Sequence, residues 1–152
     1  MSDRQRATLV THGTIVFLLG LAAGFPFAFE ILQRIELWPV PGTLPFDPPG
    51  DLRGWRMAHL EGVLNGLVLF AVAGIAPVLR LTAGSARTVV VALLVTAWGN
   101  TVASIIGPLS ETRGLAFGGF WNSIVYLLFV AAIVGIVTAL VVILRAARAR
   151  TD

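Results

Sequence analysis

The sequence predicts an all-α integral membrane protein, a bundle of four transmembrane helices with both termini in the cytoplasm. First, 57% of the 152 residues are hydrophobic and only 12% are charged, whereas a soluble domain carries about a quarter charged residues. Second, the apolar residues gather into four blocks of about 20 residues, the length that crosses roughly 30 Å of hydrocarbon. Third, arginines cluster at the ends of alternate blocks.

Little of the chain lies outside these blocks, so residues 1–152 are expected to form a single membrane domain. Pro26 lies within the first block and Pro77 near the end of the second, and each is expected to kink or end its helix. A cleaved signal peptide is not expected, because the first block is long and contains His12 near its start. The expected spans are 9–31, 57–79, 88–107 and 123–144.

The distribution of arginine sets the expected topology. The termini and the second connection hold Arg4, Arg6, Arg80, Arg87, Arg145, Arg148 and Arg150. In the other two connections acidic residues dilute the arginines: Arg34, Arg53, Arg56 and Arg113 stand with Glu36, Asp47, Asp51 and Glu111. The positive-inside rule therefore predicts cytoplasmic termini and a multi-pass protein of the inner membrane. The expected partner is the lipid bilayer, whose anionic headgroups the basic tail can touch; aromatic and basic residues do not interleave, so nucleic acid is not expected.

The first connection, 32–56, is long and holds five prolines: Pro39, Pro41, Pro45, Pro48 and Pro49. It should be extended and rich in turns, and it serves either as a lid or as a strap across the bundle. Trp38 and Trp55 fit interfacial anchors at the outer membrane surface. The third connection, 108–119, is punctuated by glycine and lies on the same predicted side, so the two connections could together close one mouth of the bundle.

Each block carries small residues four apart, a spacing that lets helix backbones approach closely in lipid. Two interpretations stay open, namely packing within one bundle and contact between subunits. The seams are Gly20/Gly24/Ala28, Ala58/Gly62/Gly66, Gly99/Ala103/Gly107 and Ala131/Gly135/Ala139.

The second block carries His59, Glu61 and Asn65. An unpaired polar group in hydrocarbon costs kilocalories, so ionisable residues here are functional candidates. Glu61 and Asn65 are four apart and share a helix face, whereas His59 lies about 120° from Asn65 at 100° per residue. His59 and Asn65 thus meet a large flat cofactor from two directions or serve different subunits, and a single metal ion does not fit. Glu61 is as readily neutral, or paired with arginine, as active in chemistry.

The chain has no cysteine, which excludes disulfides, thiolate metal ligands and c-type haem attachment. The imidazoles of His12 and His59 are the only ones available. His59 is either a metal ligand or a hydrogen-bond donor to a carbonyl or to Glu61 near the membrane surface. His12 fits a polar partner at the membrane edge better than a second ligand.

Other polar residues extend the candidate site. Asn100 and Ser104 share a face of the third block, and Asn65 and Asn100 are either interhelical hydrogen-bonding groups or substrate-facing ones. Arg113, in the loop that follows, could hold a propionate or another carboxylate in a bidentate pair. Tyr126 in the fourth block is either a packing residue or a source of a phenol.

Two motifs identify a resemblance. Residues 49–66 read P-G, then G-W-R-M-A-H, then L-N-G, and residues 98–118 read W-G-N, then R-G-L-A-F-G. In these motifs the sequence resembles the styrene oxide isomerase family. The resemblance implies a homotrimer of four-helix membrane subunits that holds haem b between protomers. It implies that His59 is the axial iron ligand and that Asn65 lines the substrate side.

The implied activity is the rearrangement of a small hydrophobic aryl or alkyl epoxide to an aldehyde. In the family, ferric haem acts as a Lewis acid on the epoxide oxygen, and a 1,2-hydride shift follows the opening of the C–O bond. An apolar membrane site would exclude the water that traps the cation as a diol. At the cofactor we expect His59, Trp55 and Arg113; beside the substrate we expect Asn65, Asn100 and Ser104.

The sequence departs from the family pattern at two positions. Ser104 stands where the family has a tyrosine, and Thr96 stands where it has an acidic residue. Serine carries no phenol and cannot contact an epoxide from the same distance. Two alternatives therefore stay open beside the isomerase: a small haem-binding or electron-transfer membrane subunit without isomerase activity, and a transporter or assembly subunit without a cofactor.

Overall fold

The computed structural model describes residues 1–149, which form four long helices and one short hairpin. By length and composition, all four helices are apolar enough to cross a membrane. The all-α four-helix membrane fold predicted from the sequence is thus confirmed. In chain order the elements are α1 (Asp3–Leu32), β1 (Arg34–Glu36), β2 (Thr43–Pro45), α2 (Leu52–Leu79), α3 (Ala83–Leu109) and α4 (Phe120–Arg148).

Every helix begins before its apolar block. In α1, α2 and α3 a polar cap lies ahead of the first apolar turn, whereas Gly119 before α4 forms no side-chain cap. Ser2 forms a capping box with Gln5 at the start of α1. The Asp51 side chain accepts from the Gly54 N–H, and Thr82 caps α3 in the same way. Such caps satisfy N–H groups that have no partner within the helix. Pro26 does not end α1, which continues to Leu32.

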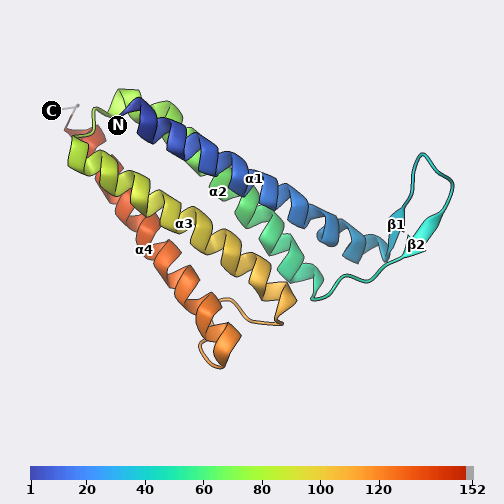
Figure 1. Cartoon of the computed structure of the whole chain (residues 1–152). Helices are drawn as coiled ribbons and strands as arrows, with labels where there is room; N and C mark the ends of the chain where they lie inside the picture. Colours follow the sequence, from blue (N-terminus) through green and yellow to red (C-terminus); the bar gives the residue numbers. More distant parts are fainter. Residues whose placement is uncertain (150–152) are drawn as a thin grey trace.

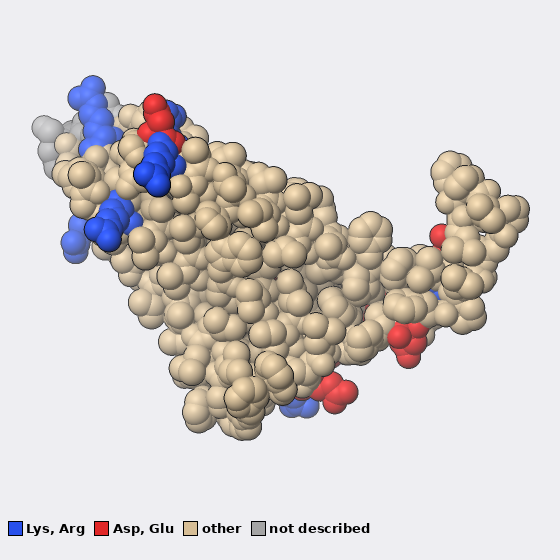
Figure 2. Space-filling view, viewed as in Figure 1, with Lys and Arg blue, Asp and Glu red and all other residues tan. Residues whose placement is uncertain are grey.

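The helices pack as two antiparallel pairs, α1 with α2 and α3 with α4, and α2 and α3 join the pairs (Figure 1). The two pairs diverge from the end that carries both termini toward the end that carries the hairpin. Arginine side chains gather at the terminal end, and the surface between the two ends is almost free of charge (Figure 2). The start of α1 and the end of α4 therefore share one side, as an even number of spans requires; the cytoplasmic location of the termini is a prediction.

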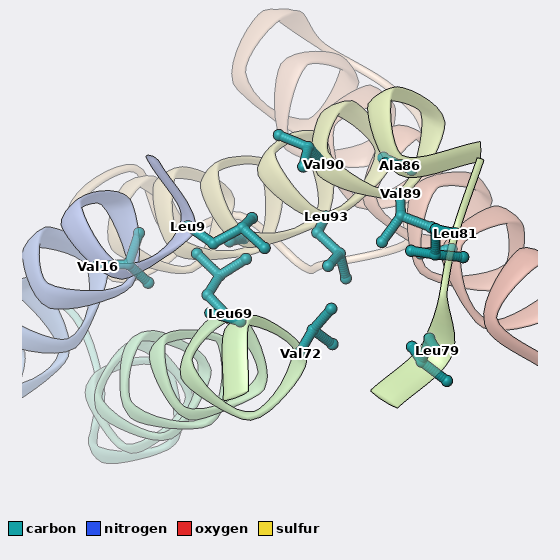
Figure 3. Close-up of a cluster of buried hydrophobic side chains, with 14 residues drawn as sticks. Leu9, Val16, Leu69, Val72, Leu79, Leu81, Ala86, Val89, Val90 and Leu93 are labelled. Atoms are coloured by element: carbon teal, nitrogen blue, oxygen red, sulfur yellow. The ribbon is translucent and has the colours of Figure 1, made fainter. Parts of the chain in front are cut away.

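The main apolar core fills the half of the bundle near the termini (Figure 3). Leu69 of α2 and Leu93 of α3 are fully buried there, with Leu9 and Val16 of α1. The predicted polar residues of α2 and α3 lie in the other half, toward the hairpin. The packed core thus closes the candidate site on its terminal side.

The small-residue seams bring backbones together within the bundle. A Cβ built on Gly62 would lie 2.4 Å from the Gly20 Cα, and one on Gly20 would lie 2.5 Å from the Val63 nitrogen. In the second pair, a Cβ on Gly135 would lie 2.6 Å from the Ala92 carbonyl oxygen. For these positions the structure supports the interpretation of packing within one subunit.

The connection between α1 and α2 is extended, as its prolines predict, and β1 and β2 pair as an antiparallel hairpin that projects from the bundle (Figure 1). Trp38 at its tip is 88% exposed, which suits an interfacial anchor. The same expectation is wrong for Trp55, which is only 7% exposed. Trp55 lies in the first turns of α2 and packs against Ala23 and Ala58, so its ring faces the bundle and not the lipid.

Candidate functional site

His59 is held by a backbone carbonyl of the neighbouring helix. Its Nδ1 lies 2.9 Å from the carbonyl oxygen of Gly20 in α1. A carbonyl can only accept, so Nδ1 carries the hydrogen, and in the neutral ring Nε2 keeps its lone pair. The hydrogen-bonding interpretation of His59 is therefore correct for one nitrogen. It leaves the other nitrogen available as a ligand, the arrangement in which proteins usually present histidine to a metal.

Two further residues of α1 shape the space around this imidazole. A Cβ on Gly24 would lie 3.0 Å from His59 Nδ1, so glycine leaves the room that the ring occupies. The ring of Phe27 stacks on the imidazole, with centroids 6.2 Å apart and planes inclined by 23°. The Gly20 carbonyl and the Phe27 ring fix the position of His59. The residue is only half-buried, so part of it stays open to the surface of the bundle.

His12 is placed differently and keeps no such lone pair. The indole N–H of Trp98 donates to His12 Nδ1 over 3.1 Å, which ties α3 to α1. The lone pair of Nδ1 is thereby used, and in the neutral ring the other nitrogen carries the hydrogen. This contact agrees with the expectation that His12 is a polar partner.

Asn65 connects α2 with α3. Its amide nitrogen donates to the carbonyl oxygen of Glu61 at 2.8 Å and to the Glu61 carboxyl oxygen Oε2 at 2.9 Å. Its own Oδ1 accepts a long hydrogen bond of 3.5 Å from the amide of Asn100. Asn65 is 7% exposed, so this network holds it rigidly inside the bundle. The interhelical interpretation of both asparagines is correct, and the Oδ1 of Asn100 has no hydrogen-bond partner among the described residues.

The two polar directions of α2 diverge, as the helical angle predicts. His59 turns to α1 and Asn65 turns to α3. No group of three or more His, Cys, Asp or Glu side chains within residues 1–149 could hold a metal ion. A metal at His59 would thus take one ligand from this chain. A porphyrin iron fits that donor set, because the ring supplies its own nitrogen ligands and leaves an axial position for imidazole.

Ser104 carries a buried hydroxyl without a partner. It is 2% exposed, and its Oγ makes no hydrogen bond with the described residues. Asn100 contacts Asn65 of α2, and Pro108 lies against Gly54 of α2. Ser104 lies midway between Asn100 and Pro108, four residues from each, so it is on the same, α2-facing side of α3. An unpaired polar atom in such a place is costly unless something else satisfies it.

Thr96, at the position where the family pattern has an acidic residue, forms part of the contact between α3 and α4. Its Oγ1 lies 2.9 Å from the carbonyl oxygen of Ala92 and 3.0 Å from that of Ala132, and donates into this pair. A Cβ on Gly135 would lie 2.6 Å from the same Oγ1. The seam between α3 and α4 leaves no room for a longer acidic side chain here.

The remaining candidates lie near the hairpin end. The indole N–H of Trp55 donates to the Pro49 carbonyl at 2.7 Å, so this ring fixes the connection before α2. Arg113 is exposed in the α3–α4 connection, and its backbone N–H donates to Asn122 Oδ1 at 3.1 Å. No hydrogen bond or ion pair within residues 1–149 joins the Arg113 side chain to His59 or the asparagines. Tyr126 packs edge-on against Phe117, which fits its packing interpretation.

Sequence reasoning missed the partner of His59. Gly20 acts through its carbonyl and Gly24 through its missing side chain, and neither is a chemistry-bearing residue type. The small-residue seam of the first block includes both glycines and predicts a close helix contact there, but it does not identify the residue that they contact. Thr101 and Glu30 were also missed; each has a buried oxygen without a partner in the described chain.

Comparison with known proteins agrees with this geometry. The family model for styrene oxide isomerase matches residues 5–148. A styrene-oxide isomerase of Pseudomonas fluorescens is 29% identical over 108 residues, which cover 70% of this chain and 63% of that relative. The match thus spans less than two thirds of the relative's length. Since the family model covers nearly all of the chain, including all four helices, the chain belongs to the styrene oxide isomerase family.

Proposed function

We propose that this protein is a membrane-bound isomerase that rearranges a small hydrophobic aryl or alkyl epoxide to an aldehyde, with ferric haem b as cofactor. The observation that supports it best is the pairing of His59 Nδ1 with the Gly20 carbonyl, which leaves Nε2 free. The relative named a styrene-oxide isomerase supports the reaction class. When bound, ferric haem supplies a Lewis-acidic iron for the epoxide oxygen.

The chain's own residues divide the remaining work. His59 would bind the iron through Nε2, and the Gly20 carbonyl, which fixes the ring, would make it a stronger donor. Trp55 braces the start of α2, and Arg113 pairs with a carboxylate of the cofactor. Because His59 lies half-open at the bundle surface, the cofactor lies between subunits, and we propose a homotrimer in the inner membrane.

On the substrate side, Asn100 presents its free Oδ1 and Ser104 its unpaired hydroxyl, while Asn65 holds Asn100 in place. The reaction breaks one C–O bond of the epoxide and moves a hydride from the neighbouring carbon to the cationic carbon. The oxygen lone pair then completes the carbonyl, so no atom enters or leaves. Water would instead add to the cation, and the apolar walls of the bundle exclude it.

The first prediction tests the reaction itself. Protein purified with haem supplementation is expected to convert styrene oxide or an alkyl epoxide to the aldehyde without forming diol. With deuterium at the terminal carbon of styrene oxide, the product should carry deuterium on both carbons, because the hydride migrates within one molecule. Gas chromatography with mass detection measures both.

Two outcomes would contradict the proposal. If the wild-type protein is colourless after haem supplementation, it binds no haem, and the proposed mechanism is wrong. A Soret band with reversible reduction but no carbonyl product from any epoxide would identify a haem-binding or electron-transfer subunit instead.

The second prediction concerns Asn100. Asn100→Leu keeps the branching and the number of side-chain heavy atoms, and the hydrogen bond that it loses is the long one to Asn65. The fold and the Soret band should therefore be unchanged. Turnover should fall by about 100-fold, the usual effect of removing one positioned polar group from a reacting centre. Steady-state aldehyde formation measures this. Thr14→Val is the control, because Thr14 is exposed on α1 and its hydroxyl bonds only to the Val10 carbonyl of the same helix. Unchanged turnover would assign Asn100 to packing.

A further inference from the structure

A pocket of about 660 Å³ lies at the terminal end of the bundle, away from the proposed haem site. The connection between α2 and α3 forms one wall, and the last turns of α4 form the other. Arg80 and Arg145 line it from opposite sides, together with the hydroxyl-bearing residues Thr82 and Ser85. Thr82 donates its hydroxyl hydrogen to Ser85 Oγ at 3.0 Å. The two guanidinium groups and the Ser85 hydroxyl are therefore the donors available to bind a phosphate.

These two arginines have no acidic partner among the described residues. The ion pairs there are Arg6 with Asp3, and Arg34 with Glu36. Both Arg80 and Arg145 are exposed. Arginine side chains dominate the charge of this end of the molecule, as Figure 2 shows. The pocket thus carries positive charge that residues 1–149 do not neutralise.

A second cavity of about 690 Å³ lies along α3 and α4, and its polar lining residues are Arg87, Thr88 and Thr138. The two cavities share one stripe of α4, because their lining residues on that helix follow at intervals of three or four. From Arg145 to Ala131 the helical rise is about 21 Å, longer than the roughly 15 Å of one bilayer leaflet's hydrocarbon. The walls of this groove are mainly apolar: Val91, Ala92, Val95, Ala131, Val134 and Gly135.

We propose that this groove binds an anionic phospholipid of the leaflet at the terminal end. The headgroup phosphate lies between Arg80 and Arg145, and an acyl chain lies along the groove between α3 and α4. Basic pockets between transmembrane helices select anionic headgroups in this way. A second copy of the chain is a poorer occupant of this pocket, because its own terminal end is also rich in arginine and would not neutralise Arg80 and Arg145. Inorganic phosphate would leave the apolar groove unused.

The test uses full-length protein in phosphatidylcholine nanodiscs with trace spin-labelled phosphatidylglycerol or spin-labelled phosphatidylcholine. The fraction of immobilised label should be higher for phosphatidylglycerol. Arg80→Gln and Arg145→Gln should each weaken that preference by about fivefold, the effect of one basic residue near an anionic surface. Arg4→Gln is the matched control, because it removes the same charge at the same end without lining the pocket. It should keep the preference.

A second variant tests the groove independently of the arginines. Ala131→Trp fills the groove at an exposed position, so it should lower lipid immobilisation while the fold stays intact by circular dichroism. The proposal is overturned if the wild type shows no preference, or if Arg4→Gln weakens it as much as Arg80→Gln. It is also overturned if excess inorganic phosphate abolishes it, or if Val134→Cys cross-links two copies through the groove.

Discussion

His59→Ala protein is expected to lack the Soret band of the wild type and to form no aldehyde above background. His59 is the histidine whose geometry leaves a lone pair free, because its Nδ1 donates to Gly20 and its Nε2 has no partner in the described chain. Removing it takes away the proposed iron ligand, while the small side chain leaves a space where the imidazole stood. Added imidazole should therefore restore part of the Soret band, as measured by absorption titration.

The second histidine supplies the matched control. His12→Ala also removes an imidazole from a membrane helix, but its Nδ1 accepts from Trp98 and offers nothing to a metal. The control should keep the Soret band and lose only the stability of the Trp98 contact, about 1 kcal/mol. If both variants keep the band, or if His12→Ala alone loses it, the assignment of His59 is wrong.

The sequence could predict what is local to one helix. Hydropathy located the four spans because the bilayer fixes their length. Helical geometry correctly predicted that Glu61 and Asn65 share a face, and that His59 turns away from Asn65. Both follow from the fixed angle per residue and need no knowledge of the neighbours.

What depends on the neighbours was out of reach. The partner of His59 is a backbone carbonyl, and every residue has one, so only the register of α1 against α2 selects Gly20. The inward orientation of Trp55 depends in the same way on where α1 and α3 lie. The starts of α1, α2 and α3 also lay ahead of the apolar blocks, because their N-caps are the polar residues Ser2, Asp51 and Thr82, which hydropathy does not report.

Gly62→Ala is expected to destabilise the protein strongly, because its Cβ would make the closest contact of any glycine among the described residues. The new methyl would lie 2.4 Å from the Gly20 Cα and 2.6 Å from its nitrogen. These atoms are backbone, so α1 and α2 must separate, and overpacking of this kind costs about 3 kcal/mol. Unfolding in mixed micelles, followed by circular dichroism, measures the change in the free energy of unfolding.

Gly74→Ala provides the control on the same helix. A Cβ at Gly74 meets nothing within 4 Å, so it should leave stability unchanged or raise it slightly, since alanine favours the helix. The comparison also reaches the candidate site, because Gly20 both packs against Gly62 and accepts from His59. If α1 moves away, His59 loses its orienting carbonyl, and affinity for haem should fall by about 10-fold or more even in protein that remains folded. Equal behaviour of the two variants would show that the contact between α1 and α2 neither limits stability nor positions His59.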